Sequence, residues 1–206
     1  TSDNPLTMTF TASESTSDFA VGDITVSGGS LSSFSASSTT ITQLGSDIDG
    51  EAGYDYSGHN VSMDSDGDRV AIGAHGNDGT ATGAGHVRIY EWGGSSWSQM
   101  GSDIDGEAAG DRSGYSVSMD SDGDRVAIGA YLNDGNGSNA GHVRIYEWGG
   151  SSWSQLGSDI DGEAAGDYSG YSVSMDSDGD RVAIGANNND GNGSNAGHVR
   201  IYEWGG

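Results

Sequence analysis

The sequence has no cysteine, no lysine and a single proline among its 206 residues. Without cysteine, disulfides cannot hold the fold together, and the redox compartment stays open. No stretch approaches the roughly 18 consecutive apolar residues of a membrane-spanning helix, and the N-terminus lacks the basic and apolar regions of a signal peptide. We therefore expect no membrane insertion, and the chain as given is expected to be soluble.

Positive charge is also scarce, because 31 acidic residues face only 7 basic ones, for a formal charge of -24. Nucleic acid and anionic membrane surfaces would repel such a chain. An acidic surface instead suits divalent cations, a saline medium or a positively charged partner.

Patterns typical of enzymes are missing as well. The sequence has no Gly-x-Ser-x-Gly nucleophile elbow and no glycine-rich phosphate loop followed by a helix. Acidic pairs are common, but they recur nearly unchanged along the chain, whereas the two carboxyl groups of a glycosidase differ in their environments. We predict that the protein is not an enzyme.

What the sequence does contain is a long internal repeat. The segment Ser113–Trp148 recurs almost unchanged, and its copies begin at equal spacing, at Ser57, Ser113 and Ser169. Many of the 37 glycines fall at fixed positions of this repeat, which favours turns over disorder. A fixed period of this length indicates an architecture in which each unit buries one face against the next.

Each repeat predicts four short antiparallel strands. In the second copy these are Gly114–Met119, Arg125–Ala130, His142–Trp148 and Trp153–Ile160. Four antiparallel strands make one blade of a β-propeller. The small residues Ala127 and Gly129 would allow a neighbouring blade to approach closely.

The segment 1–40 has a different, Ser/Thr-rich composition. The stretches TFTASE, DFAVGDITVSGG and LSSF resemble part of a bacterial Ig-like surface domain. We therefore divide the chain into a β segment at 1–40 and repeats at about 41–98, 99–154 and 155–206.

The pattern SGYSVSMDSDGDRVAIGA, followed by an Asn/Asp/Gly loop and GHVRIYEW, resembles the FG-GAP repeat of integrin-type β-propellers in a short bacterial form. The resemblance implies an all-β fold of about three blades and an extracellular or cell-surface binding or adhesion module. Thr40–Ile48 would supply the fourth strand that the last copy lacks. Because propellers usually have four to eight blades, we expect a partial propeller or one completed by oligomerisation.

The calcium loop of that family is not carried over to this sequence. Asp120, Asp122 and Asp124 alternate, but Gly123 separates the last two and the next strand follows at once. Two residues and the closing acid are missing, so this segment predicts a plain hairpin turn.

Strand alternation places the loop after the fourth strand and the loop between the second and third strands on one side of the blade. Their carboxylates are candidate calcium ligands, since calcium takes six to eight oxygen atoms. The alternative is a solvated acidic surface of a salt-adapted protein. The candidate ligands are Asp47, Asp49, Glu51, Asp55, Asp78, Asp103, Asp105, Glu107, Asp111, Asp134, Asp159, Asp161, Glu163, Asp167 and Asp190.

The same loops contain most of the differences between copies, which is typical of a surface that contacts a ligand. The alternative is unselected drift of the loops. The candidate ligand-binding residues are Tyr56, His75, Arg112, Tyr131, Leu132, Tyr168, Asn187 and Asn188. A protein or glycan partner is expected, and a structural subunit of a filament, sheath or capsid decoration is the second hypothesis.

Two further repeated features favour structural roles. His86, His142 and His198 lie in separate blades without a second histidine nearby in sequence, which favours hydrogen-bonded structural histidines over a metal or pH-sensing ring. Tryptophans on either side of the Gly-Gly-Ser-Ser turns are expected to pack across a hairpin; sugar stacking is the alternative.

Overall fold

A computed structural model describes residues 41–204 of the chain. The chain divides into two units, Thr1–Leu44 and Gly45–Gly206. Because the described residues begin at position 41, the predicted Ig-like segment at 1–40 lies outside them. Within 41–204 every regular element is a β-strand, and no helix there could cross a membrane.

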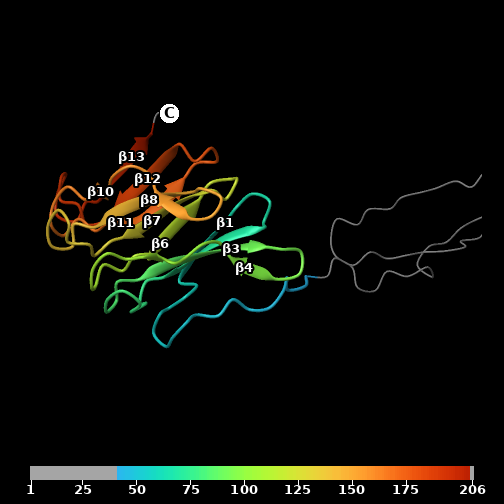
Figure 1. Cartoon of the computed structure of the whole chain (residues 1–206). Helices are drawn as coiled ribbons and strands as arrows, with labels where there is room; N and C mark the ends of the chain where they lie inside the picture. The colour runs from blue at the N-terminus through green and yellow to red at the C-terminus, as the bar shows by residue number, and fades with distance from the viewer. Residues whose placement is uncertain (1–40, 205–206) are drawn as a thin grey trace, which may run out of the picture. The chain divides into compact units, whose positions relative to one another are not determined.

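The first blade contains five strands in antiparallel pairs (Figure 1). Strand β1 (Asn60–Met63) pairs with β2 (Arg69–Ala74), and β2 pairs with β3 (His86–Trp92). Two short strands, β4 (Trp97–Gln99) and β5 (Ile104–Asp105), both pair with β3.

The second blade repeats this order, and the third repeats its first three strands. The second comprises β6 (Ser116–Met119), β7 (Arg125–Ala130), β8 (His142–Trp148), β9 (Trp153–Gln155) and β10 (Ile160–Asp161). The third comprises β11 (Ser169–Met175), β12 (Arg181–Ala186) and β13 (His198–Glu203). The prediction of an all-β protein with about three blades is confirmed.

Two details of the strand prediction are wrong. The fourth strand is not continuous over Trp153–Ile160, because Gly157 has a φ of 73° and turns the chain between β9 and β10. Residues 41–48 also form no strand, and Gly45 turns the chain there with a φ of 75°. The closing strand expected at Thr40–Ile48 is thus absent from the described part of this segment.

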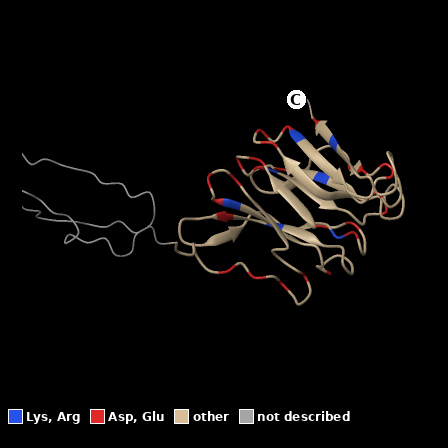
Figure 2. Ribbon diagram, turned by 180° about the vertical axis from the view of Figure 1, so that it is seen from behind, with Lys and Arg blue, Asp and Glu red and all other residues tan. Residues whose placement is uncertain are grey.

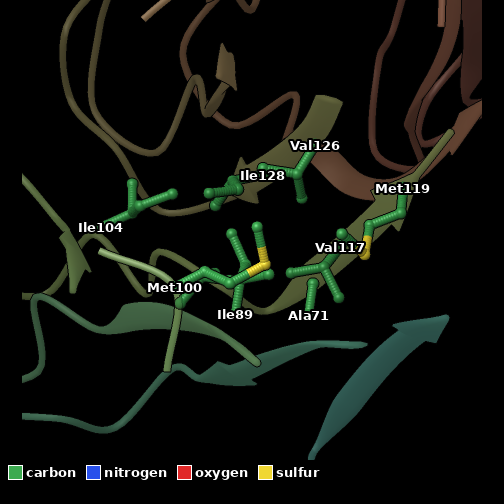
Figure 3. Close-up of a cluster of buried hydrophobic side chains, with 9 residues drawn as sticks. Ala71, Ile89, Met100, Ile104, Val117, Met119, Val126 and Ile128 are labelled. Carbon is green, nitrogen blue, oxygen red and sulfur yellow. The ribbon is translucent and has the colours of Figure 1, made fainter. Parts of the chain in front are cut away.

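The hydrophobic core lies between blades. Ile89 of the first blade, together with Ala71 and Val87, belongs to one buried cluster with Val117 and Ile128 of the second (Figure 3). A second cluster joins the second and third blades in the same way and includes Val143 and Ile145 with Val182 and Ile184. The middle blade therefore buries one face against the blade before it and the other face against the blade after it.

Small residues and serines bring the blades into close contact. A Cβ atom on Gly129 would lie 2.2 Å from the carbonyl oxygen of Gly170 in the next blade. The Ser62 hydroxyl accepts a hydrogen bond from the Met119 amide at 2.9 Å, and Ser118 does the same for Met175 at 2.9 Å. The expectation that small residues permit close approach is confirmed at Gly129.

The turns between strands also follow the predictions. Asp120 Oδ1 accepts hydrogen bonds from the amides of Asp124 and Arg125, both at 3.1 Å, and closes the β6–β7 hairpin as a plain turn. Trp148 and Trp153 are paired across β8 and β9, and their rings lie 5.3 Å apart. The tryptophans therefore pack across the hairpin as expected.

Candidate functional site

The loops predicted to share one side of the blades are hydrogen-bonded to one another. The Arg112 amide donates to the Gly83 carbonyl at 3.2 Å, and the Leu132 amide donates to the Asp111 carbonyl at 3.4 Å. The connection between two blades thus contacts the β2–β3 loop of one blade and the β7–β8 loop of the next. Acidic residues concentrate in the loops at the strand ends (Figure 2).

Three of the predicted calcium ligands accept hydrogen bonds that hold these loops together. Asp111 is 3% exposed, and its Oδ2 atom accepts hydrogen bonds from the Ala108 amide and from Asn133 Nδ2, both at 3.0 Å. Asp55 and Asp167 make the same pair of contacts in the other blades. In each of these residues the Oδ2 atom connects the loops.

A second set of predicted ligands accepts hydrogen bonds within the loop between the second and third strands of each blade. Asp134 Oδ1 accepts a hydrogen bond from the Asn139 amide at 2.7 Å, and Asp78 and Asp190 do the same at the equivalent positions. Asp105 and Asp161 lie in the short strands β5 and β10. Burial, followed by the charge of Asp103, raises the pKa of Asp105 above its ordinary value.

Most of the remaining carboxylates lie near the repeated histidines. His86 Nδ1 lies 3.8 Å from Glu51 Oε2 and 3.6 Å from Asp103 Oδ2. In the next blade His142 Nδ1 lies 3.8 Å from both Glu107 Oε2 and Asp159 Oδ2. We call these two groups the histidine–carboxylate clusters: Glu51, His86 and Asp103 in the first, and Glu107, His142 and Asp159 in the second.

The third blade has part of the same arrangement, with His198 Nδ1 at 3.6 Å from Glu163 Oε2. Asp47 and Asp49, by contrast, take no part in a histidine–carboxylate cluster of the described residues.

In each cluster an arginine lies near Oε1 of the glutamate, the oxygen that is farther from the histidine. Arg88 Nη1 lies 3.9 Å from Glu51 Oε1, and Arg144 Nη1 lies 3.6 Å from Glu107 Oε1. Burial and the Arg144 charge lower the pKa of His142, so this imidazole is neutral at pH 7. A neutral imidazole has a lone pair that can bind a metal ion.

The expectation of hydrogen-bonded structural histidines is wrong for His86. Its side chain is 1% exposed, and neither ring nitrogen has a hydrogen-bond partner in the described part of the chain. The sequence analysis considered only a second histidine as the partner of each histidine, so the acids were not connected with His86. The available signal was that Glu51, His86 and Asp103 each recur one repeat later, at Glu107, His142 and Asp159.

Aromatic side chains from the connections between blades, from the β2–β3 and β7–β8 loops and from strand β11 form a second feature. Tyr115 is the central ring, at 4.3 Å from Tyr131, 5.1 Å from Tyr171 and 4.8 Å from His59. His75 extends the row, since its ring stacks on Tyr56 at 5.2 Å. We call this row of contacting rings the aromatic strip; its members are Tyr56, His59, His75, Tyr115, Tyr131, Tyr168 and Tyr171.

The aromatic strip contains neutral rings within a strongly acidic protein. Burial, helped by the charges of His59 and Arg112, lowers the pKa of His75 to about 4. A hydrogen bond to the Tyr171 hydroxyl, at 3.2 Å, raises the pKa of Tyr115 to about 12. These two rings therefore remain neutral at pH 7, and the strip presents aromatic faces and hydroxyl groups.

The strip contains four of the predicted ligand-binding residues: Tyr56, His75, Tyr131 and Tyr168. Arg112 lies close enough to His75 and Tyr131 to affect the pKa of both. No ring contact places Leu132, Asn187 or Asn188 in the strip. His59, Tyr115 and Tyr171 were not predicted; the signal for them is that the first repeat has His59 where the other two have tyrosine.

Backbone strain marks one position of the connecting loops in every blade. Tyr56, Arg112 and Tyr168 occupy equivalent positions and have φ values of 54°, 61° and 57°. Bulky residues rarely adopt this left-handed conformation, and such strain concentrates at functional sites. The packing of the loops holds these three side chains in place in or beside the strip.

Comparisons with known proteins agree with the sequence resemblances. Residues 103–146 and 159–202 match the FG-GAP repeat, and residues 1–89 match a bacterial Ig-like domain. The Ig-like match thus extends into β3, although β1 and β2 pair as β6 and β7 do. A search of curated proteins gives no match.

Among solved structures, hydrazine synthase from Kuenenia stuttgartiensis is similar with a TM-score of 0.46 and 10% identity. The alignment covers 79% of this chain and 36% of that chain.

Proposed function

We propose, on the premise that this chain carries FG-GAP repeats, that it is a non-enzymatic binding or adhesion module that acts outside the cell or at its surface. The bacterial Ig-like match supports the same setting. The blades provide a rigid frame, and the loops between them would contact the partner. Repeated, nearly identical units favour multivalent contact over a single active site.

The observation that carries this proposal is the aromatic strip. Tyr56 is 58% exposed and Tyr171 is 39% exposed, so the strip is accessible at both ends of the row. Tyrosine provides a large contact area with few rotatable bonds, together with a hydroxyl for hydrogen bonding. A neutral row of rings with hydroxyls fits a glycan chain, which presents flat apolar ring faces and many hydroxyl groups.

The test is binding of the full chain to an array of bacterial and plant polysaccharides. The chain supplies its own fold-compatible variants, because Tyr131→Asn and Tyr115→His introduce the residues that the other copies have at Asn187 and His59. We expect the double variant to bind at least tenfold more weakly, or about 1.4 kcal/mol.

The matched control is Tyr54→Gly. Tyr54 is 85% exposed with a φ of 71°, and the other copies have glycine at the equivalent positions Gly110 and Gly166. This variant should bind as the original chain does. Equal loss in both variants, or binding to a protein partner but to no polysaccharide, would contradict the glycan proposal.

A second candidate function, a self-assembling structural subunit, is supported by the two outer blades. Val61 and Met63 of β1 are 58% and 53% exposed, and Val199 and Ile201 of β13 are 66% and 71% exposed. Their equivalents in the middle blade are buried between blades. The exposed face of the third blade therefore matches a face that already packs against its neighbour inside this chain.

A second copy of the chain could cover these faces head to tail, which yields a closed ring or an open filament. We expect light scattering to show a mass that rises with concentration, and Ile201→Asp to return the chain to a monomer. Ser152→Asp, which adds the same charge in an exposed turn, should leave the assembly unchanged. A monomer at all concentrations would refute this candidate.

A further inference from the structure

The side chain of His86 is buried and has no hydrogen-bond partner among residues 41–204. It is 1% exposed, and neither Nδ1 nor Nε2 donates a hydrogen bond to these residues or accepts one from them. A buried polar group left without a partner costs about 1–3 kcal/mol. Such a group requires an explanation, and a bound ion is one of the few available.

His86 Nδ1 is directed at two carboxylates to which it is not hydrogen-bonded. The distances to Glu51 Oε2 and Asp103 Oδ2, 3.8 and 3.6 Å, are too long for hydrogen bonds. The three ligand atoms nevertheless all lie within 4.8 Å of one another. A tetrahedral metal with bonds of about 2.1 Å separates its ligands by about 3.4 Å, so a small inward movement would complete the site.

We propose that each histidine–carboxylate cluster binds a divalent transition-metal ion of the zinc type. The same donors recur in the second cluster, where Glu107 Oε2, His142 Nδ1 and Asp159 Oδ2 lie within 4.8 Å of one another. The same three residue types therefore form one site in each of the first two blades. The binding does not depend on the glycan proposed above.

The ligand types select the metal. Calcium and magnesium prefer oxygen atoms alone, whereas an imidazole nitrogen with two carboxylates suits zinc and its neighbours. Calcium, the metal expected from the sequence for these carboxylates, therefore fits the clusters less well. With three protein ligands, a fourth position remains open for water or a partner's ligand atom.

The surroundings support the glutamate ligand. Arg88 Nη1 lies near Glu51 Oε1, which is not the oxygen closest to His86, and Arg144 has the same relation to Glu107. Charged partners of this kind orient a carboxylate ligand from outside the metal site.

The cluster is also open to solvent from one side. Asp103 lines a surface groove together with Tyr146 and Trp153, and Glu51 is 46% exposed. An ion can therefore approach both carboxylates of the cluster from solvent.

A bound metal ion would stabilise the connection between two blades. Glu107 lies in the connection between β5 and β6, His142 begins β8, and Asp159 precedes β10. One ion would thus join the connection between the blades to strand β8 and to the residue before β10. Because the metal binds the folded chain better than the unfolded one, it should raise the melting temperature.

The test is zinc binding to the full chain, measured by equilibrium dialysis with metal analysis. We expect two tightly bound zinc ions per chain, one in His86→Gln and none in the double variant with His142→Gln. Cobalt should give a visible absorption band that decreases in the same order. Calcium at the same concentration should bind more weakly and independently of either histidine.

Two controls keep the result interpretable. Asp66→Asn, in an exposed turn outside the clusters, removes one negative charge and should leave two zinc ions bound. If His86→Gln fails to fold, Glu51→Gln, at a half-exposed position, removes a ligand from the same cluster. Zinc binding that is unchanged in these cluster variants, or a calcium affinity equal to that for zinc, would overturn the proposal.

Discussion

Replacement of Gly129 by alanine is expected to lower the free energy of unfolding by about 2–3 kcal/mol. The new Cβ atom would lie 2.2 Å from the carbonyl oxygen of Gly170 and 2.3 Å from Ser116 Oγ. The serine can rotate, but the carbonyl belongs to the backbone of the next blade. The second and third blades would have to separate, which weakens the buried cluster between them.

The matched control for this prediction is Gly185→Ala, which changes the same position of the same RVAIGA sequence in the third blade. A Cβ atom on Gly185 would meet Ser172 Oγ at 2.4 Å, but the nearest backbone oxygen, that of Ser172, is 3.7 Å away. Urea denaturation should show a loss below about 1 kcal/mol for this variant. Equal losses in the two variants would show that blade contact is not the cause.

The pKa values of Asp120 and Asp176 are expected to shift in opposite directions from the ordinary value, although the local sequences of the two residues are identical. Burial raises the pKa of Asp120 to about 6, against its ordinary value of 3.8. The hydrogen bond from the Arg181 amide, assisted by the Asp180 contacts, lowers the pKa of Asp176. The difference arises because the third blade covers Asp120: a Cβ atom on Gly179 would lie 2.9 Å from its Oδ2 atom.

The two shifts have opposite effects on stability. Between about pH 4 and pH 6 the folded state holds a proton on Asp120 that the unfolded state has released, so stability falls as the pH rises through this window. For Asp176 the folded pKa lies below the unfolded value. Its contribution is present above pH 3.8 and is lost as the pH falls.

Carboxyl carbon chemical shifts measured by NMR across about pH 3–8 would test both assignments. Asp120→Asn keeps the acceptor oxygen for the Asp124 and Arg125 amides and should remove the loss of stability between about pH 4 and pH 6. Asp176→Asn should leave that loss unchanged. Parallel titration of the two carboxyl groups would contradict the role given to the neighbouring blade.

The pattern of residues along the chain was enough to predict the frame of the fold. The equally spaced repeat, the alternation in Ser116–Met119 and Arg125–Ala130, and the Trp148–Trp153 pair all correspond to the observed sheet. These features depend on hydrogen bonds and side-chain faces within one unit. Local sequence controls them directly, because a strand pairs with its neighbour across a short turn.

The candidate sites depended on contacts that no single repeat contains. The sequence supplied Glu51, Asp103 and the loop tyrosines as candidates, but it assigned His86 to a hydrogen bond that residues 41–204 do not provide. Tyr115 and His59 were also passed over, and only the contact between blades brings their rings together.

The sequence by itself determined the first three strands of each blade, the turns between them and the side of the blade on which the acidic loops lie. The tertiary structure alone decided which copies of a residue are buried, as Asp120 and Asp176 show. The physical reason is that burial depends on what the neighbouring blade covers, and identical segments have different neighbours at the middle and at the edge of the array.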